Sequence, residues 1–116
     1  MELIEEMTLV EQLNFQAEFK RPIMDFHLMI EKFGYKNIDH KQLSQFSSGM
    51  KQRVKLMLSI YFENEVIYLD EPTSNLDSTG IEWYQNEMQT LIGKRTILIA
   101  SNQRYEYDFC PNSIQL

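Results

Sequence analysis

The sequence predicts an α/β fold in which a helical half precedes a small parallel sheet. Two short apolar runs, 66–69 and 96–100, have the length and composition of buried strands. The segment 78–92 between them has helical spacing, and a strand, a helix and a strand in this order form a βαβ unit with parallel strands. We therefore expect a helical subdomain over 1–62 and a sheet-bearing portion over 63–116.

The first two helices have recognisable ends. Thr8 followed by Glu11 fits a capping box ahead of leucines at helical spacing. Pro22 suits the first turn of a second helix, and Gly34 lies just past its end. The polar connection 37–46 has room for a helical turn.

The two later helices also have capping signals. The serine pair 47–48 supplies a cap for a third helix that extends to about Phe62. Thr79 and Glu82 fit a second capping box, and Gly93 fits the end of that helix.

The chain after the second strand contains shorter elements. Residues 104–109 have room for one or two helical turns, and Pro111 ends them. A final short strand is expected over 113–116.

Composition limits the classes of function. A hydrophobic content of 43% and an aromatic content of 12% indicate a folded chain. The formal net charge of −6 gives no basic surface for nucleic acid, so no nucleic-acid partner is expected. No apolar stretch approaches the length of a membrane span, and the amino terminus is too acidic for a secretory signal. A single cysteine, Cys110, forms no internal disulfide and fits a reducing compartment.

An acidic pair follows the first predicted strand. Asp70 and Glu71 stand at its carboxyl end, where open parallel sheets bind their ligands. One carboxylate can hold a metal ion while the other orients a water molecule, which favours metal-dependent phosphate chemistry. Because side chains alternate along a strand, we expect the two carboxylates on opposite faces. In isolation, the pair fits an ordinary exit from a strand equally well.

A second candidate site is the start of the third helix. Free N–H groups and the positive end of the helix dipole suit the segment with Ser47, Ser48 and Gly49 to an anion. Taken alone, these residues favour a plain helix cap.

Together, the two segments resemble an ATP-binding cassette (ABC) ATPase. The resemblance rests on the order of 47–50, a helix, a strand, the Asp70-Glu71 pair and 74–77. It implies that Asp70 is the Walker B aspartate, which holds Mg²⁺ mostly through water. It also implies that Glu71 is the catalytic glutamate, which polarises the attacking water.

The signature loop of the family corresponds here to Ser47, Ser48, Gly49 and Met50. In the family, this loop binds the γ-phosphate of ATP held by the partner subunit, so the resemblance implies two ATP-binding domains facing head to tail. The usual loop reads Leu-Ser-Gly-Gly-Gln, and Phe46, Ser48 and Met50 depart from it.

Two further positions follow from the resemblance. Ser74 and Asp77 match the D-loop, which in the family reaches across the dimer, although Asp77 also suits a cap for the next helix. Asn102 stands where the family places its switch histidine. An asparagine amide donates a hydrogen bond to phosphate but carries no charge, which implies slower or differently regulated hydrolysis.

The chain lacks a P-loop of the pattern G-x-x-x-x-G-K-[ST], since none of its four glycines begins one. In the family the P-loop precedes the motifs found here, so the resemblance implies a partial P-loop NTPase domain, the second half of a cassette. We therefore expect the chain alone to bind Mg-ATP weakly or not at all and not to hydrolyse it. A parallel sheet without its P-loop strand exposes apolar surface, so we also expect the chain to oligomerise, swap elements or rearrange.

Three functions are compatible with these observations. The leading interpretation is the ATPase component of an ABC transporter, on the cytoplasmic face of the membrane, in which ATP binding closes a dimer and hydrolysis drives a membrane-spanning subunit. The second is a soluble ABC ATPase without a transporter, such as an SMC-type protein, against which the lack of sustained heptads counts. The third is a short non-catalytic binding module, which the missing P-loop favours and the Asp70-Glu71 pair disfavours.

Overall fold

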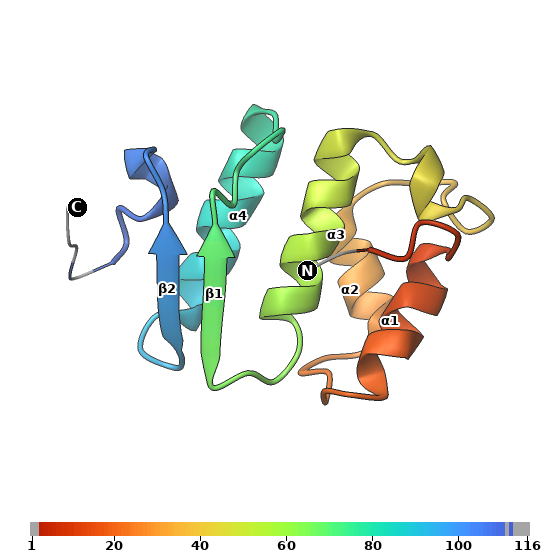
Figure 1. The fold of residues 1–116 in the computed structure, drawn as a ribbon, viewed down its shortest axis with the longest axis horizontal. Coiled ribbons are helices and arrows are strands. Elements are labelled where there is room, and N and C mark those ends of the chain that lie inside the picture. Colours follow the sequence, from red (N-terminus) through yellow and green to blue (C-terminus); the bar gives the residue numbers. More distant parts are fainter. Residues whose placement is uncertain (1–2, 111, 113–116) are drawn as a thin grey trace.

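The computed structural model describes residues 3–110 and 112 and has the predicted α/β class (Figure 1). In chain order the elements are α1 (Leu9–Ala17), α2 (Phe26–Phe33), η1 (Leu43–Gln45), α3 (Ser48–Ile60), β1 (Val66–Asp70), α4 (Ser78–Leu91), β2 (Thr96–Ala100) and η2 (Arg104–Glu106), where η marks a 3₁₀-helix. None of the helices described is both long enough and apolar enough to cross a lipid bilayer. The strand expected over 113–116 and the break at Pro111 lie outside the described residues.

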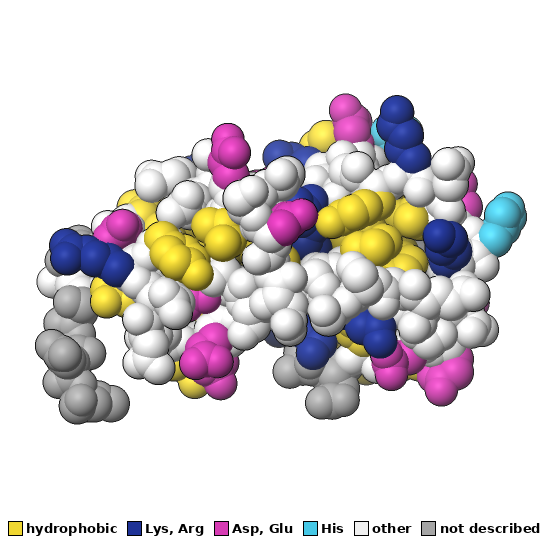
Figure 2. Space-filling model, turned by 90° about the horizontal axis from the view of Figure 1, so that it is seen from above, with side chains coloured by type: hydrophobic (Ala, Val, Ile, Leu, Met, Phe, Trp, Pro, Cys, Tyr) yellow, Lys and Arg dark blue, Asp and Glu magenta, His cyan; other side chains and the backbone are white. Residues whose placement is uncertain are grey.

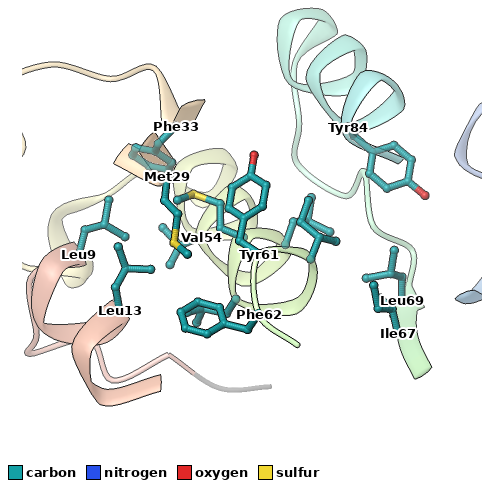
Figure 3. Close-up of a cluster of buried hydrophobic side chains, with 14 of the residues drawn as sticks. Leu9, Leu13, Met29, Phe33, Val54, Tyr61, Phe62, Ile67, Leu69 and Tyr84 are labelled. Atoms are coloured by element: carbon teal, nitrogen blue, oxygen red, sulfur yellow. The ribbon is translucent and has the colours of Figure 1, made fainter. Parts of the chain in front are cut away.

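The sheet consists of β1 and β2, which pair in parallel over their whole length, as the βαβ order predicts. Ile67 and Leu69 are buried, and Figure 3 shows both on β1 within the core cluster. Val66, Tyr68 and Leu98 alternate with the inward-facing residues, and each is more than half exposed. One face of the sheet therefore presents apolar side chains to solvent.

One hydrophobic cluster joins the helices to the sheet. Figure 3 shows side chains from α1, α2, α3, β1 and α4 in it. Among them, Leu13, Phe33, Met57, Ile67 and Met88 are each 2% exposed or less. Such a chain buries a modest core, so each of these contacts is a sizeable share of the stability.

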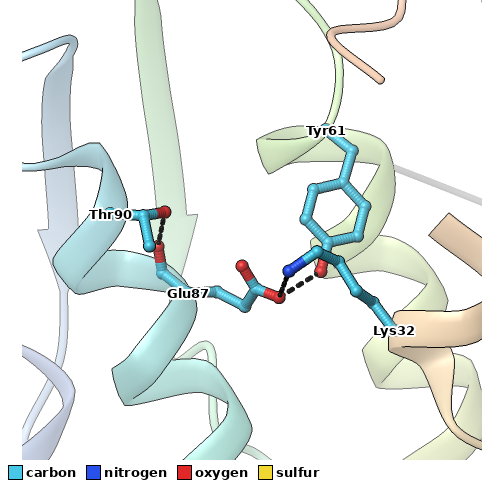
Figure 4. Close-up of polar contacts among 4 residues, drawn as sticks. All are labelled: Lys32, Tyr61, Glu87 and Thr90. Atoms are coloured by element: carbon cyan, nitrogen blue, oxygen red, sulfur yellow. Dashed lines mark hydrogen bonds and ion pairs between the residues drawn. The ribbon is translucent and has the colours of Figure 1, made fainter. Parts of the chain in front are cut away.

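A polar contact also ties α2, α3 and α4 together (Figure 4). The Glu87 carboxylate on α4 accepts hydrogen bonds from the Tyr61 hydroxyl at 2.6 Å and from Lys32 Nζ at 3.2 Å. Burial, and then the hydrogen bond to Glu87, raises the pKa of Tyr61 above its ordinary value, so the hydroxyl stays a donor. The division into portions 1–62 and 63–116 stays a prediction, and both the core and Glu87 bridge it.

The start of α2 differs from the prediction. The helix begins at Phe26 after Asp25, and Pro22 instead forms an isolated antiparallel bridge with Phe62. Proline's fixed φ suits both a helix start and an extended segment, so the residue alone does not decide between them. The predicted end is confirmed, because Gly34 caps the helix at φ 81°.

The capping predictions for α1 and α4 had different outcomes. The box of Thr8 and Glu11 is confirmed, with both side chains accepting backbone N–H groups. The box of Thr79 and Glu82 was wrong, because Asp77 caps α4 by accepting the N–H of Gly80 at 2.8 Å. A carboxylate two residues earlier competes for the same first-turn donors.

We expect the 116-residue chain to self-associate, because its open sheet face is apolar. Replacing Tyr68, which is 63% exposed on that face, with lysine should raise the monomer fraction measured by light scattering. Phe19→Lys is the matched control, since Phe19 is 69% exposed outside the sheet. A monodisperse wild-type monomer, or an equal effect of the two variants, would contradict this expectation.

Candidate functional site

The candidate residues gather at one end of the molecule. In Figure 1, the carboxyl ends of β1 and β2 and the amino-terminal ends of α3 and α4 all lie on the upper side. Figure 2 views this end and shows apolar areas with charged side chains between and around them. Helix N-termini attract anions and strand carboxyl ends carry ligand sites, so this arrangement suits a phosphorylated ligand.

The acidic pair lies where the sequence predicts it. Asp70 is the last residue of β1 and pairs with Ala100 of β2. Glu71 follows, and its N–H donates to the Ala100 carbonyl at 2.8 Å. Both carboxylates are exposed, so both are accessible to a metal ion, to water or to a ligand.

Strand alternation does not decide where the Glu71 carboxylate lies, because β1 ends at Asp70 and Glu71 follows it. Its φ is 45°, in the left-handed region that non-glycine residues rarely adopt. Such a conformation costs on the order of 1–3 kcal/mol and persists only where the surroundings enforce it. Here Ala100 accepts the N–H of Glu71, and the Ser74 N–H donates to the Glu71 carbonyl at 3.1 Å.

The signature-like loop caps α3. The Ser47 hydroxyl accepts the N–H of Met50 at 3.1 Å, which confirms Ser47 as the cap. Ser48 starts the helix and is exposed, as Ser47 is. Gly49 lies against the turn after the acidic pair, where an added Cβ would be 2.7 Å from the Asn75 carbonyl oxygen.

The two predicted loops border one cavity of about 220 Å³. Its lining includes Ser47, Ser48 and Gly49 from the first loop and Asn75, Leu76 and Asp77 from the second. The remaining lining residues are Tyr35 and Arg53, which the sequence analysis missed. Asp70, Glu71 and Asn102 lie outside this lining, so the cavity and the acidic pair are separate parts of the same end. Met50 and Ser74, although they belong to the two predicted loops, also lie outside the lining.

Arg53 is buried, with 6% exposed. Its guanidinium donates to the Phe33 carbonyl at 3.0 Å and lies over the rings of Tyr35 and Trp83, 5.2 and 5.4 Å from their centroids. It follows Gly49 by one helical turn on α3, so the spacing i, i+4 is the signal that could have identified it. It supplies positive charge at the wall of the cavity.

Asn102 is exposed just after β2, at the same edge of the sheet as Glu71. The Gln103 N–H donates to the Ser101 hydroxyl at 2.9 Å, so Asn102 sits at the tip of a closed turn. The Ser101 hydroxyl donates in turn to the carboxylate of Glu106. Glu106 is 1% exposed, and sequence patterns gave no sign of its burial.

A magnesium ion fits this end only if a bound phosphorylated ligand supplies further oxygen ligands to the ion. Among the described residues, no group of three or more His, Cys, Asp or Glu side chains is arranged to hold a metal ion. Mg²⁺ keeps several waters and takes one or two protein carboxylates beside substrate phosphates. The exposed Asp70 therefore fits as a single carboxylate ligand.

We expect Gly49→Ala to destabilise the chain by about 1–3 kcal/mol, because the new methyl group meets backbone that cannot rotate away. Helix propensity alone would favour alanine by about 1 kcal/mol, so a net loss reports the contact with Asn75. Urea unfolding followed by circular dichroism measures it, with the neighbouring Ser48→Ala as control. A Gly49→Ala variant as stable as wild type would contradict the close approach.

Comparisons with known proteins agree with the motif order. The family model described as ABC transporter matches residues 1–74. The daunorubicin resistance ATP-binding protein DrrA3 of Streptomyces coeruleorubidus is 33% identical over 78 residues, which cover 67% of this chain and 25% of that protein. The lantibiotic transport ATP-binding protein SrtF of Streptococcus pyogenes is 36% identical over 75 residues, covering 64% and 33%.

A solved structure shares the fold. The dimeric structure of the ATP-binding cassette MJ0796, in a post-hydrolysis state bound to ADP and Pi, superposes with a TM-score of 0.70 at 20% identity. The match covers 87% of this chain and 48% of that one. The chain thus spans between a quarter and a half of the length of these relatives.

Proposed function

Since this chain belongs to the ABC transporter family, we propose that it forms part of the ATPase component of an ABC transporter. The observation that carries the proposal is the meeting of residues 47–49 and 75–77, from the two predicted loops, at one cavity on the end that also holds Asp70 and Glu71. An isolated helix cap or strand exit would not require these segments to converge. The chain spans between a quarter and a half of the length of the relatives it matches, so we propose substrates and partners for a protein of the relatives' full length.

The proposed roles follow from position and chemistry. Asp70 would hold Mg²⁺, and the bound ion would stabilise negative charge on the nucleotide phosphates. Glu71 polarises the attacking water. Asn102 stands at the same edge and donates a hydrogen bond to the terminal phosphate from its amide.

We propose that the N-terminal end of α3 binds a second nucleotide. The segment of Ser47, Ser48, Gly49 and Met50 forms a helix N-terminus, which suits the γ-phosphate of ATP held by a second ATP-binding domain. The Ser47 hydroxyl already accepts the N–H of Met50, so the backbone N–H groups of Ser48 and Gly49 are the proposed donors. Asn75, Leu76 and Asp77 lie across the cavity from the first loop. We propose that they shape the same contact together with Ser74, which precedes them in the chain. We propose a head-to-tail dimer of such domains, associated with a membrane-spanning subunit on its cytoplasmic face.

ATP hydrolysis in two preparations tests the proposal. One is the 116-residue chain, and the other is the protein encoded by the complete natural reading frame that contains it. We expect no phosphate release and weak Mg-ATP binding by the first, and Mg²⁺-dependent hydrolysis by the second, whose sequence would supply G-x-x-x-x-G-K-[ST]. Absence of hydrolysis in the complete protein would refute the ATPase role, and hydrolysis by the chain alone would refute its dependence on further sequence.

A further inference from the structure

We propose that Glu106 is a positioning residue that fixes the loops of Glu71 and Asn102 relative to each other. The inference rests on the proposed function, since it concerns the geometry of the hydrolytic site. Glu106 is not accessible to a ligand at this end, because only 1% of its surface is exposed. Its carboxylate instead contacts one loop with each oxygen.

The first oxygen holds the turn after Glu71. Glu106 Oε2 accepts the backbone N–H of Thr73 at 2.7 Å and also the Thr73 hydroxyl. Thr73 is 33 residues away in the chain and is 6% exposed. A backbone N–H only donates, so this oxygen must be an acceptor, and hydrogen bonds to an ionised carboxylate are stronger than neutral ones.

The peptide unit between Pro72 and Thr73 is also held by a hydrogen bond from α3. Gln52 on α3 donates from Nε2 to the Pro72 carbonyl at 2.8 Å. The Pro72 carbonyl and the Thr73 N–H belong to one planar peptide unit, so both of its polar groups are fixed. This unit is the second after Glu71, so fixing it limits the movement of the turn that holds the unfavourable φ of 45° at Glu71.

The second oxygen holds the turn of Asn102. Glu106 Oε1 accepts the hydroxyl of Ser101, whose oxygen accepts the N–H of Gln103 at 2.9 Å. Asn102 lies between these two residues, so its backbone is fixed from both sides. A single buried carboxylate thereby connects the turns that present the proposed water-polarising group and the proposed phosphate donor.

The position of Glu106 is itself set by α4. The Tyr84 hydroxyl donates to the Glu106 carbonyl at 2.6 Å, and Gln85 Nε2 donates to the Tyr105 carbonyl at 3.2 Å. Tyr84 is 1% exposed, and burial, then the charge of Glu106, raises its pKa above the ordinary value, so it remains a donor. The carboxylate therefore has a rigid base from which to hold both loops.

Glu106→Gln tests the inference, because the amide keeps the shape but places an NH₂ group where donors already point. In the complete protein we expect kcat for ATP hydrolysis to fall about 10- to 100-fold, with an unchanged KM for ATP, as a misplaced catalytic group would cause. In the 116-residue chain we expect the Thr73 amide to exchange with solvent at least about tenfold faster by NMR. The control is Asp108→Asn, which removes an exposed carboxylate from the same segment.

The outcomes separate the two proposals. An inactive wild-type protein would refute the ATPase role and this inference with it. If the wild type is active, two results would overturn this inference alone. One is an unchanged kcat in the Glu106→Gln variant, and the other is an equal change of kcat and KM in the Glu106→Gln and Asp108→Asn variants. If Glu106→Gln does not fold, Ser101→Ala leaves the contact of Glu106 with Thr73 in place. It removes the hydroxyl that joins Glu106 to the Asn102 turn, together with the bonds of that hydroxyl to Gln103. An unchanged kcat in that variant would overturn the inference.

Discussion

Replacing Glu71 with glutamine is expected to lower kcat for ATP hydrolysis at least about 100-fold in the complete protein, while ATP still binds. A general base contributes about 10²- to 10⁴-fold to such reactions, and an amide does not accept the proton of the attacking water. Glutamine has the same backbone preference and nearly the same shape, so the left-handed turn at φ 45° is disturbed little. The variant therefore isolates the carboxylate chemistry from the fold.

Phosphate release and nucleotide binding should be measured separately for Glu71→Gln. Glu65→Gln is the matched control, because Glu65 is also an exposed acid beside β1 but lies at its amino end. We expect that variant to keep wild-type kcat. Comparable kcat values for the two variants would remove Glu71 from the reaction.

Replacing Phe33 with alanine is expected to destabilise the 116-residue chain by about 3–5 kcal/mol, the usual cost of deleting a buried aromatic ring. Phe33 is 0% exposed, and its ring lies 5.0 Å from that of Tyr35 and 5.9 Å from that of Phe46. Because small domains are stable by about 5–15 kcal/mol, the loss is a large part of the total. Two of the ring's neighbours border the signature-like loop or its cavity, so the loop should loosen as well.

Urea unfolding followed by circular dichroism measures the effect of Phe33→Ala. Phe19→Ala makes the same chemical change at a ring that is 69% exposed, and we expect a change within about 0.5 kcal/mol. Equal losses in the two variants would contradict the burial of Phe33 as the cause.

The sequence predicted most elements because their signals are local. The apolar strands around Ile67 and Ile97, the capping box at Thr8 and the glycine cap at Gly34 each depend on residues within one or two turns. The start of α2 was misplaced because Pro22 pairs with Phe62, far along the chain, and local patterns do not report such a bridge.

The sequence predicted the motif residues of the candidate site, but not the buried residues and hydrogen bonds that hold them in place. Glu71 and Ser47 follow from motif order and helix capping, whereas the left-handed turn at Glu71 depends on tertiary hydrogen bonds. Arg53 and Glu106 are charged residues of the kind that is usually exposed to solvent. Only the fold reveals the hydrogen-bond partners that stabilise them in the interior.

The hydrogen bonds of Glu87 connect α4 directly to α2 and to the end of α3. The Glu87 side chain is only 10% exposed, and hydrogen bonds to a charged group are stronger than those between neutral groups. We therefore expect a displacement of α2 at Lys32 to be transmitted to α4 through Glu87. Tyr61, at the end of α3, binds the same carboxylate oxygen of Glu87. Because Asp77, the N-cap of α4, lines the cavity, a displacement of α2 transmitted through Glu87 would act on the helix whose opposite end borders that cavity.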